Sequence, residues 1–203
     1  MNLHNRILPI AAFALLLFTS TNSVSAQAAE TKPAEAAYEA VLHVLIAGGQ
    51  SGGSVPSSLS AVSKSIRSEF DTSNLRLINT YFGRLSNTGS IDYRGISNAY
   101  AAESMPGAPS FLDWRLAGVR SIQDPSGQPA FHVGSFRFGA RVPIRMAIYS
   151  DEKNPAPVNY ESIGLTVDRV SVRENTPALI GTLTQPRTDG TLFLVLTVRN
   201  ADK

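Results

Sequence analysis

The chain has 203 residues and a formal net charge of +2, and it contains no cysteine. The absence of cysteine excludes disulfide crosslinks, thiol catalysis, thiolate zinc sites and iron–sulfur clusters. A charge this small argues against a general binder of nucleic acids or anionic lipids. The length suits one domain with a hydrophobic core, after allowance for an N-terminal leader.

The first 26 residues have the three parts of a secretory signal peptide. A short polar segment ends at Arg6, an uncharged apolar run covers residues 7–18, and the following polar segment ends in Val24-Ser25-Ala26. The apolar run is much shorter than the ~20 residues that a membrane-spanning helix needs. We therefore expect cleavage after Ala26 or, at the next small-residue site, after Ala28. The mature chain is predicted to have no membrane span; an uncleaved anchor is the alternative.

A strand–helix–strand unit is predicted after a flexible mature N-terminus at residues 27–37, where apolar residues are scarce. Residues 38–46 are apolar on both faces, as in a strand inside a sheet. A helix is expected from about Pro56 to Phe70, with proline at its start and apolar residues at helical spacing. Residues 75–85 are the second strand.

Short strand-like runs separated by turn residues fill the rest of the chain. We expect a hairpin turn at residues 87–89, a strand through Tyr93, and a loop or lid over residues 98–109. Further strands are predicted over residues 111–122, 131–138, 142–149, 158–172, 178–184 and 191–199. Strands at this spacing are typical of an antiparallel sandwich or a curled sheet.

The predicted fold is therefore α+β and mainly β. A single domain over residues 38–203 contains the N-terminal strand–helix–strand unit, with its helix packed on a sheet, followed by an antiparallel β-meander or sandwich.

The glycine-rich loop Gly48–Gly53 lies between a strand and a helix, where phosphate is often bound. A nucleotide-binding loop would end in Gly-Lys-Ser or Gly-Lys-Thr, whereas the chain continues as Ser54-Val55-Pro56. Proline also removes one of the amides that would donate to phosphate. The loop is predicted to be a connector, and we expect no cofactor.

Other candidate catalytic and metal-binding residues are few. After the leader, the histidines are His43 and His132, which would bind a metal only if their two strands converged. No serine stands in a Gly-x-Ser-x-Gly motif. A carboxylate pair for hydrolysis would have to come from the acids around the middle loop, namely Asp92, Glu103, Asp113 and Asp124. Acids near turns are usually solvated, so we expect no catalytic residues, no metal site and no enzyme activity.

Arginine outnumbers lysine 14 to 4, and Arg137, Arg141 and Arg145 recur at every fourth position. In an extended strand this spacing places all three on one face, provided that no bulge intervenes. Pro143 favours an edge strand or a bend at that point. Guanidinium groups suit carboxylates, phosphates or the acidic rim of a protein. These three arginines are the candidate partner-binding residues, with an ordinary solvated strand face as the alternative.

Two C-terminal strings resemble strands of the C-terminal β-region of bacterial secretins. They are Val158–Val167, which contains Tyr160-x-x-Ile163-Gly164-Leu165, and the amphipathic run Gly190–Arg199. The front strand–helix–strand unit resembles the small periplasmic N-domains of secretion proteins, and the whole order of elements is similar to that of uncharacterised exported bacterial proteins. The chain is too short to contain a secretin's membrane gate, so no pore is implied. The resemblance implies a non-enzymatic periplasmic protein that docks onto something larger.

The sequence thus predicts an exported bacterial protein, periplasmic or secreted outside the cell, that acts through protein–protein contacts. Its partner would be an envelope protein, with the chain as an accessory or assembly subunit of a cell-envelope or secretion complex. Exposed sheet edges would allow a partner strand to be added. The alternative is a small-molecule-binding module in which the loop over residues 98–109 closes over an apolar pocket. That pocket would be lined by Phe111, Trp114, Phe131, Phe136 and Phe138. The simpler interpretation is that these aromatic residues pack in the hydrophobic core.

Overall fold

The computed structural model describes residues 37–48, 53–97, 100, 108–145, 158–185 and 190–201. All of them belong to one compact unit, Glu35–Lys203. The predicted signal peptide, nearly all of the predicted flexible N-terminus and most of the predicted loop over residues 98–109 lie outside the described residues.

The described elements are mainly strands. In chain order they are β1 (Ala37–Ala47), η1 (Ser57–Leu59), α1 (Ser60–Glu69), β2 (Leu75–Ser86), β3 (Ser90–Ser97), β4 (Ser110–Ala117), β5 (Arg120–Gln123), β6 (Pro129–Arg145), β7 (Val158–Arg173), β8 (Ala178–Thr184) and β9 (Thr191–Asn200).

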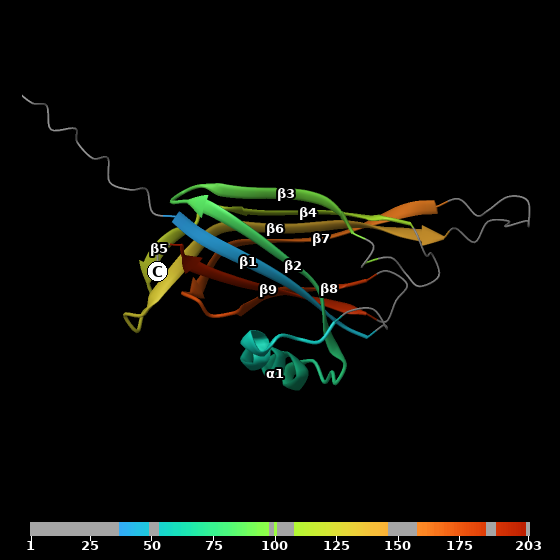
Figure 1. Ribbon diagram of the computed structural model, residues 1–203, viewed down its shortest axis with the longest axis horizontal. Helices are drawn as coiled ribbons and strands as arrows, with labels where there is room; N and C mark the ends of the chain where they lie inside the picture. Colours follow the sequence, from blue (N-terminus) through green and yellow to red (C-terminus); the bar gives the residue numbers. More distant parts are fainter. Residues whose placement is uncertain are drawn as a thin grey trace, which may run out of the picture. The chain divides into compact units, whose positions relative to one another are not determined.

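The strands form two antiparallel sheets, which we call sheet A and sheet B (Figure 1). Sheet A has the order β2-β1-β9-β8. In sheet B, β7 pairs with β6 along its length, whereas β4 and β5 pair with successive stretches of the other edge of β6, and β3 pairs with β4. The described residues form a sandwich rather than one curled sheet, and the predicted mainly-β fold, with one α-helix among these residues, is confirmed.

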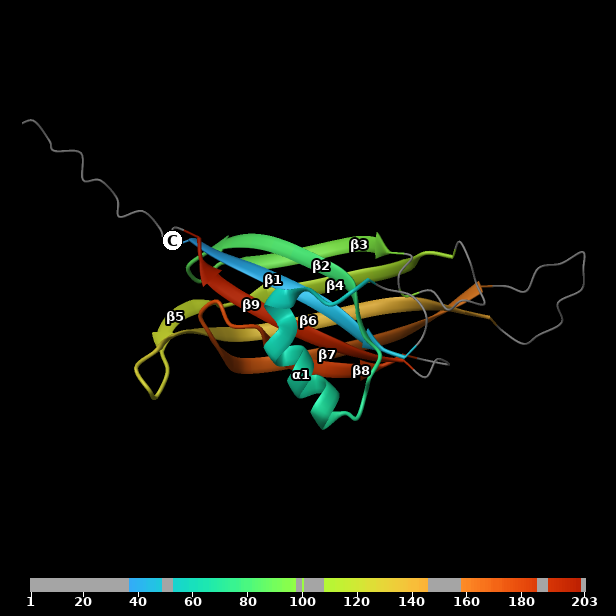
Figure 2. The same ribbon diagram turned by 60° about the horizontal axis from the view of Figure 1, so that its bottom comes forward.

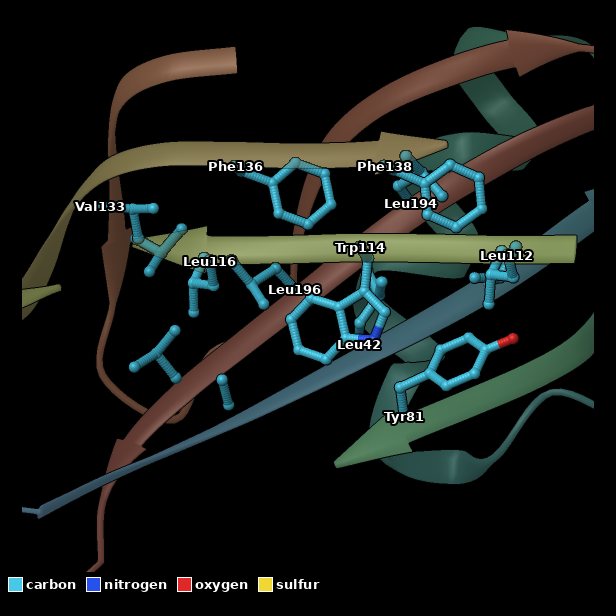
Figure 3. Close-up of a cluster of buried hydrophobic side chains, with 14 of the residues drawn as sticks. Leu42, Tyr81, Leu112, Trp114, Leu116, Val133, Phe136, Phe138, Leu194 and Leu196 are labelled. Carbon is cyan, nitrogen blue, oxygen red and sulfur yellow. The ribbon is translucent and has the colours of Figure 1, made fainter. Parts of the chain in front are cut away.

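The hydrophobic core lies between the two sheets (Figure 3). Sheet A contributes Leu42 and Leu196, and sheet B contributes Trp114 and Phe136, each with at most 1% of its surface exposed. Alternation along the strands explains this layer, because every second side chain of a strand points to the same face.

Strand β1 has both faces covered, as its apolar sequence predicts. Its inward side chains, such as Val44, enter the core, and Leu45 on the opposite face lies in a second apolar cluster under α1. The helix supplies Ile66 to this cluster, and η1 supplies Leu59. Figure 1 shows α1 on the side of sheet A that faces away from sheet B. The predicted helix over Pro56–Phe70 thus exists, but its first turn is a 3-10 helix and its α-helical part is Ser60–Glu69.

The prediction of separate strands over residues 131–138 and 142–149 is wrong, because β6 is continuous from Pro129 to Arg145. Its register with β7 runs unbroken through Pro143, which lies opposite Tyr160. The pairing with β4 ends at Arg141. Proline is tolerated here because only one neighbouring strand still needs hydrogen-bond donors from β6.

The predicted strand over residues 111–122 is interrupted by a kink that crosses sheet B. Gly118, which links β4 to β5, lies in one row with Gly134 of β6 and Arg169 of β7, and Gly118 and Arg169 have φ angles of 65° and 57°. The amide of Gly134 donates to the carbonyl oxygen of Gly118 at 3.2 Å, so the register continues from β4 into β5. At this row the side chains of β6 change faces. Odd-numbered residues such as Val133 face the core before Gly134, and even-numbered residues such as Phe136 face it afterwards.

Candidate functional site

The outer face of sheet B carries four arginines from three neighbouring strands. Directly paired residues point to the same face of a sheet, and the register places Arg137 beside Arg115 and Arg94 beside Asp113. Arg141 lies beside Phe111. All four arginine side chains are exposed, and we call them the arginine face: Arg94, Arg115, Arg137 and Arg141.

The predicted common face of Arg137 and Arg141 is therefore observed. The kink at Gly134 precedes both residues, so the alternation between them is undisturbed. Arg145 ends β6 in the same register, and its side chain lies outside the described residues.

The cations of the arginine face are poorly neutralised within the described part of the chain. Asp92 forms one ion pair with Arg94 at 3.7 Å, and the Arg94 side chain is 82% exposed, so this pair contributes little. No ion pair involves Arg115, Arg137 or Arg141 among the described residues. The guanidinium groups thus remain available to an external anion.

One cation of this face is held in place by aromatic rings. The guanidinium carbon of Arg141 lies 4.9 Å from the centre of the Phe111 ring. That ring in turn packs against Tyr160 of β7, with 5.4 Å between the ring centres. A cation–π contact of this kind orients the guanidinium without neutralising its charge.

Two glycines leave a strip of sheet B without side chains between Arg137 and Arg141. Gly139 of β6 and Gly164 of β7 lie opposite each other, and we call this pair the glycine lane. A hollow of about 470 Å³ covers it, lined also by Asp113, Ser162 and Thr166. A Cβ atom on Gly139 would lie 2.7 Å from the carboxylate oxygen Oδ1 of Asp113, so the missing side chain makes room for that carboxylate.

A second hollow lies on the other side of Asp113. It has a volume of about 580 Å³ and is lined by Arg94, Ile96 and Phe111, and it shares Asp113, Arg137 and Arg141 with the first hollow. The Ile96 side chain is 68% exposed. The outer face of sheet B is therefore grooved and mainly cationic, with one carboxylate between the grooves.

The four acidic residues considered for catalysis are not brought together. Asp92 and Asp113 lie on the outer face of sheet B, and Glu103 lies outside the described residues. Asp124 closes the β5–β6 turn, where its Oδ1 atom accepts hydrogen bonds from Ser126 and from the amide of Gln128. These bonds lower the pKa of Asp124 to about 2, which suits a structural anion rather than a proton donor.

The two candidate metal-binding histidines lie in different sheets. His43 of β1 shares a hydrogen bond with Thr80 at 3.0 Å, and burial lowers its pKa. His132 lies in β6, between Arg120 and Ser171 of the adjacent strands. No cluster of three or more potential metal ligands occurs among the residues that the structure describes.

The predicted glycine-rich connector is described only at its two ends, Gly48 and Gly53. Gly53 exchanges two backbone hydrogen bonds with Leu77 of β2, at 2.9 and 3.0 Å. This end of the loop is therefore tied to the edge of sheet A before the helical segment begins at Ser57.

The aromatic residues assigned to an apolar pocket do not line one together. Trp114, Phe131, Phe136 and Phe138 are buried in the core with at most 1% of their surface exposed. Phe111 lies on the opposite face of sheet B. Core packing, the simpler of the two predicted roles, is what the four buried residues do.

A small, partly buried polar cluster lies where β2 approaches β3. The side-chain amide of Asn79 donates to the hydroxyl oxygens of Tyr81 at 2.9 Å and Ser97 at 3.1 Å. The hydroxyl groups of Tyr81 and Tyr100 are 3.4 Å apart, and burial raises the pKa of both. These bonds tie the two sheets together at this edge.

Sequence analysis missed Arg94, Arg115 and the glycine lane. A signal for the two arginines exists, because the pattern Asp-aromatic-Arg occurs in both strands, as Asp92-Tyr93-Arg94 and as Asp113-Trp114-Arg115. In the antiparallel register each aspartate then faces an arginine of the other strand. Only the pairing of the strands shows that these charges join those of β6.

No protein-family model and no curated protein matches this sequence. Within the described part of the chain, no helix combines the length and the hydrophobicity required to cross a bilayer.

Proposed function

We propose that this chain is an exported, non-enzymatic protein of the bacterial cell envelope that binds an acidic partner protein through the arginine face. It would be periplasmic or secreted, and it would serve as an accessory or assembly subunit of a larger complex. The observation that carries the proposal is the gathering of Arg94, Arg115, Arg137 and Arg141 on a sheet face that no described element covers, with one weak ion pair among the described residues there.

The physical chemistry of this face favours acidic protein surfaces. Guanidinium groups form paired hydrogen bonds with carboxylates, and a sheet fixes the positions from which they extend. Arg115 and Arg137 have no internal ion pair among the described residues that would have to be broken on binding. Charges at the rim of such an interface raise the association rate and make it dependent on salt.

The leader and the secretin resemblance support the location. The first 26 residues have the polar, apolar and small-residue segments that signal peptidase substrates require. The resembling strings coincide with β7 and β9, which lie in sheet B and sheet A respectively. N-terminal sequencing of the protein purified from a bacterial periplasm should give a chain that starts at Gln27 or at Ala29. A chain retaining Met1 would contradict export by cleavage.

Site-specific photocrosslinking in the producing bacterium tests the binding surface. A photoreactive amino acid at Thr166, which is exposed beside Arg137, should capture a partner, whereas the same group at Ser65 on the exposed side of α1 should not. Mass spectrometry should map the adduct to a partner segment rich in aspartate and glutamate.

Charge reversal supplies the matched control. The double substitution Arg137→Glu and Arg141→Glu should abolish the adduct, and Lys64→Glu with Arg67→Glu on α1 should leave it intact. An adduct that survives the first pair, or that is lost equally with the second, would rule out the arginine face as the binding surface.

A further inference from the structure

We propose that the acidic partner segment binds as an added β-strand on the free edge of β7, and that its carboxylates reach Arg137 and Arg141 on either side of the glycine lane. This inference rests on the proposed function and specifies its geometry: which edge is used, in which register, and with which side chains.

Among the described residues, five strands have a free sheet edge, and four of them carry features that discourage strand addition. β2 has a register shift opposite Val44 and Leu45, and β8 has one between Leu179 and Gly181. β3 carries Asp92 and Arg94 on its outer face, and β5 has only four residues. Bulges, short length and charges are the usual protections of sheet edges.

The fifth edge strand, β7, lacks these protections between Ser162 and Val167, a stretch flanked by Glu161 and Asp168. Its register with β6 is unbroken from Val158 to Asp168, and the residues from Ser162 to Val167 are uncharged. Among the described residues, β7 has a ladder only with β6. The strand is nevertheless anchored, because the Leu165 side chain occupies the space beside Gly181 of β8. Within the described part of the chain, β7 is therefore an ordered edge whose outward backbone groups pair with no other strand.

An added strand would extend the side-chain rows of the arginine face. One of its residues would lie beside Thr166 in the row of Arg137, and another, four positions away, beside Ser162 in the row of Arg141. The two arginine rows are roughly 13 Å apart along the strands, and the added strand is roughly 10 Å from β6. Extended glutamate and arginine side chains together span that gap, since only the short Thr166 and Ser162 lie between them.

The middle residue of the added strand would lie beside Gly164. Across the glycine lane it faces the carboxylate of Asp113, whose oxygen sits over Gly139. A third acidic residue at this position would meet a like charge. The structure therefore favours the pattern Glu-x-Ser-x-Glu over one with three successive outward-facing glutamates.

A second copy of this chain fits the edge less well than an acidic partner. Pairing of β7 with another β7 in the register that centres the two Gly164 residues would place only the uncharged Ser162, Gly164 and Thr166 of the other copy beside the rows of Arg137 and Arg141. It would also bring two cationic faces together in one continuous sheet. Charge complementarity thus selects an acidic occupant.

A synthetic peptide tests the geometry directly. Fluorescein-labelled Val-Glu-Val-Ser-Val-Glu-Val, titrated with the mature protein and followed by anisotropy, should bind at least tenfold more tightly than the same peptide with lysine in place of glutamate. Methylation of alternate backbone nitrogens on one edge of the peptide should abolish binding, and methylation on its other edge should not. Arg137→Ala with Arg141→Ala should weaken binding at least tenfold, and Lys64→Ala with Arg67→Ala should leave it unchanged.

Amide hydrogen exchange identifies the edge that is used. The bound peptide should slow the exchange of outward amides between Ser162 and Val167, and those of β3 should be unaffected. Binding that depends on the arginines but tolerates both methylated peptides, or that protects β3, would overturn strand addition and leave the proposed function standing. Protection of β7 that grows with protein concentration without peptide would show that a second copy is the occupant. Failure of both the peptide and the photocrosslinking in cells would remove the proposed function itself.

Discussion

The outer faces of the two sheets have opposite characters, although both belong to one sandwich. On sheet A, α1 and η1 cover the apolar residues Leu45, Phe193 and Val195 (Figure 2). The acid of that face, Glu39, lies between Arg84 at 2.7 Å and Arg199 at 2.8 Å, each on a neighbouring strand. On sheet B no described element covers the outer face, and Arg115 and Arg137 have no ion pair among the described residues.

This difference separates stability from recognition. Apolar side chains under a helix and a carboxylate between two guanidinium groups are interactions that the folded chain satisfies internally. Exposed cations beside a groove that have no ion-pair partner within the chain contribute little to the stability of the fold. Such cations are typical of surfaces that bind a partner electrostatically. The following variants test whether the two faces divide these roles.

The largest expected contrast is between two phenylalanines, one on each outer face. Phe193 is 1% exposed under α1 and contacts Phe70 edge to face, with 5.0 Å between ring centres. Phe193→Ala should lower the free energy of unfolding by about 3–5 kcal/mol, the usual cost of removing a buried aromatic side chain. The Phe111 side chain is half-exposed on the outer face of sheet B, so Phe111→Ala should lower the free energy of unfolding by only about 1 kcal/mol. Urea denaturation of both variants measures the difference, and equal losses would show that sheet B's outer face is also a structural one.

The second contrast concerns the paired carboxylate of sheet A. Hydrogen bonds from Arg84 and Arg199 lower the pKa of Glu39, so the stability that it contributes is present above its unfolded pKa of about 4.3 and is lost as the pH falls through the lower folded value. Glu39→Gln should therefore lower the Tm at pH 7, and the decrease should be smaller than that caused by Phe193→Ala. The gap between this variant and the parent protein should close as the pH is lowered below about 4. Calorimetry from pH 7 to 3 checks this. A difference in Tm that persists at pH 3 would mean that the substitution disturbs the packing around residue 39 rather than removing a charge.

The parts of this picture that were predictable from the sequence are local. Apolar residues on both faces of residues 38–46 predicted a covered strand, and β1 indeed has the core on one side and α1 on the other. The shared face of Arg137 and Arg141 followed from period-two alternation, because no irregularity lies between them.

The parts that were missed depend on pairing between distant segments. The row of Gly118, Gly134 and Arg169 exists only because the link between β4 and β5 aligns there with β6 and β7. The convergence of Arg94 and Arg115 with β6 likewise requires the registers of β3 with β4 and of β4 with β6. A shift of one residue in either register would send these side chains to the other face, and residue order alone does not determine the register.

A smaller effect is expected in the glycine lane. Gly139→Ala places a Cβ atom against the end of the Asp113 side chain, which is able to rotate away, so the free energy of unfolding should change by less than about 1 kcal/mol. Gly164→Ala should cost more, because its Cβ atom would lie 3.0 Å from the backbone carbonyl oxygen of Phe138. Denaturation curves of the two variants show which substitution lowers the free energy of unfolding more. The reverse order would indicate that the Asp113 carboxylate is held rigidly in place.

The smallest effect on folding is expected from the arginine face itself. Arg137→Ala removes one exposed cation that has no ion pair among the described residues, so the free energy of unfolding should stay within about 0.5 kcal/mol of the parent value. Because Arg115 is a like charge directly beside Arg137, this variant should be slightly more stable than the parent protein in low salt. This gain should vanish at roughly 0.5 M salt, where surface repulsion is screened. Denaturation at the two salt concentrations measures it. A clear loss of stability in low salt would mean that Arg137 helps to hold the fold together, and the division between a structural face on sheet A and a recognition face on sheet B would no longer stand.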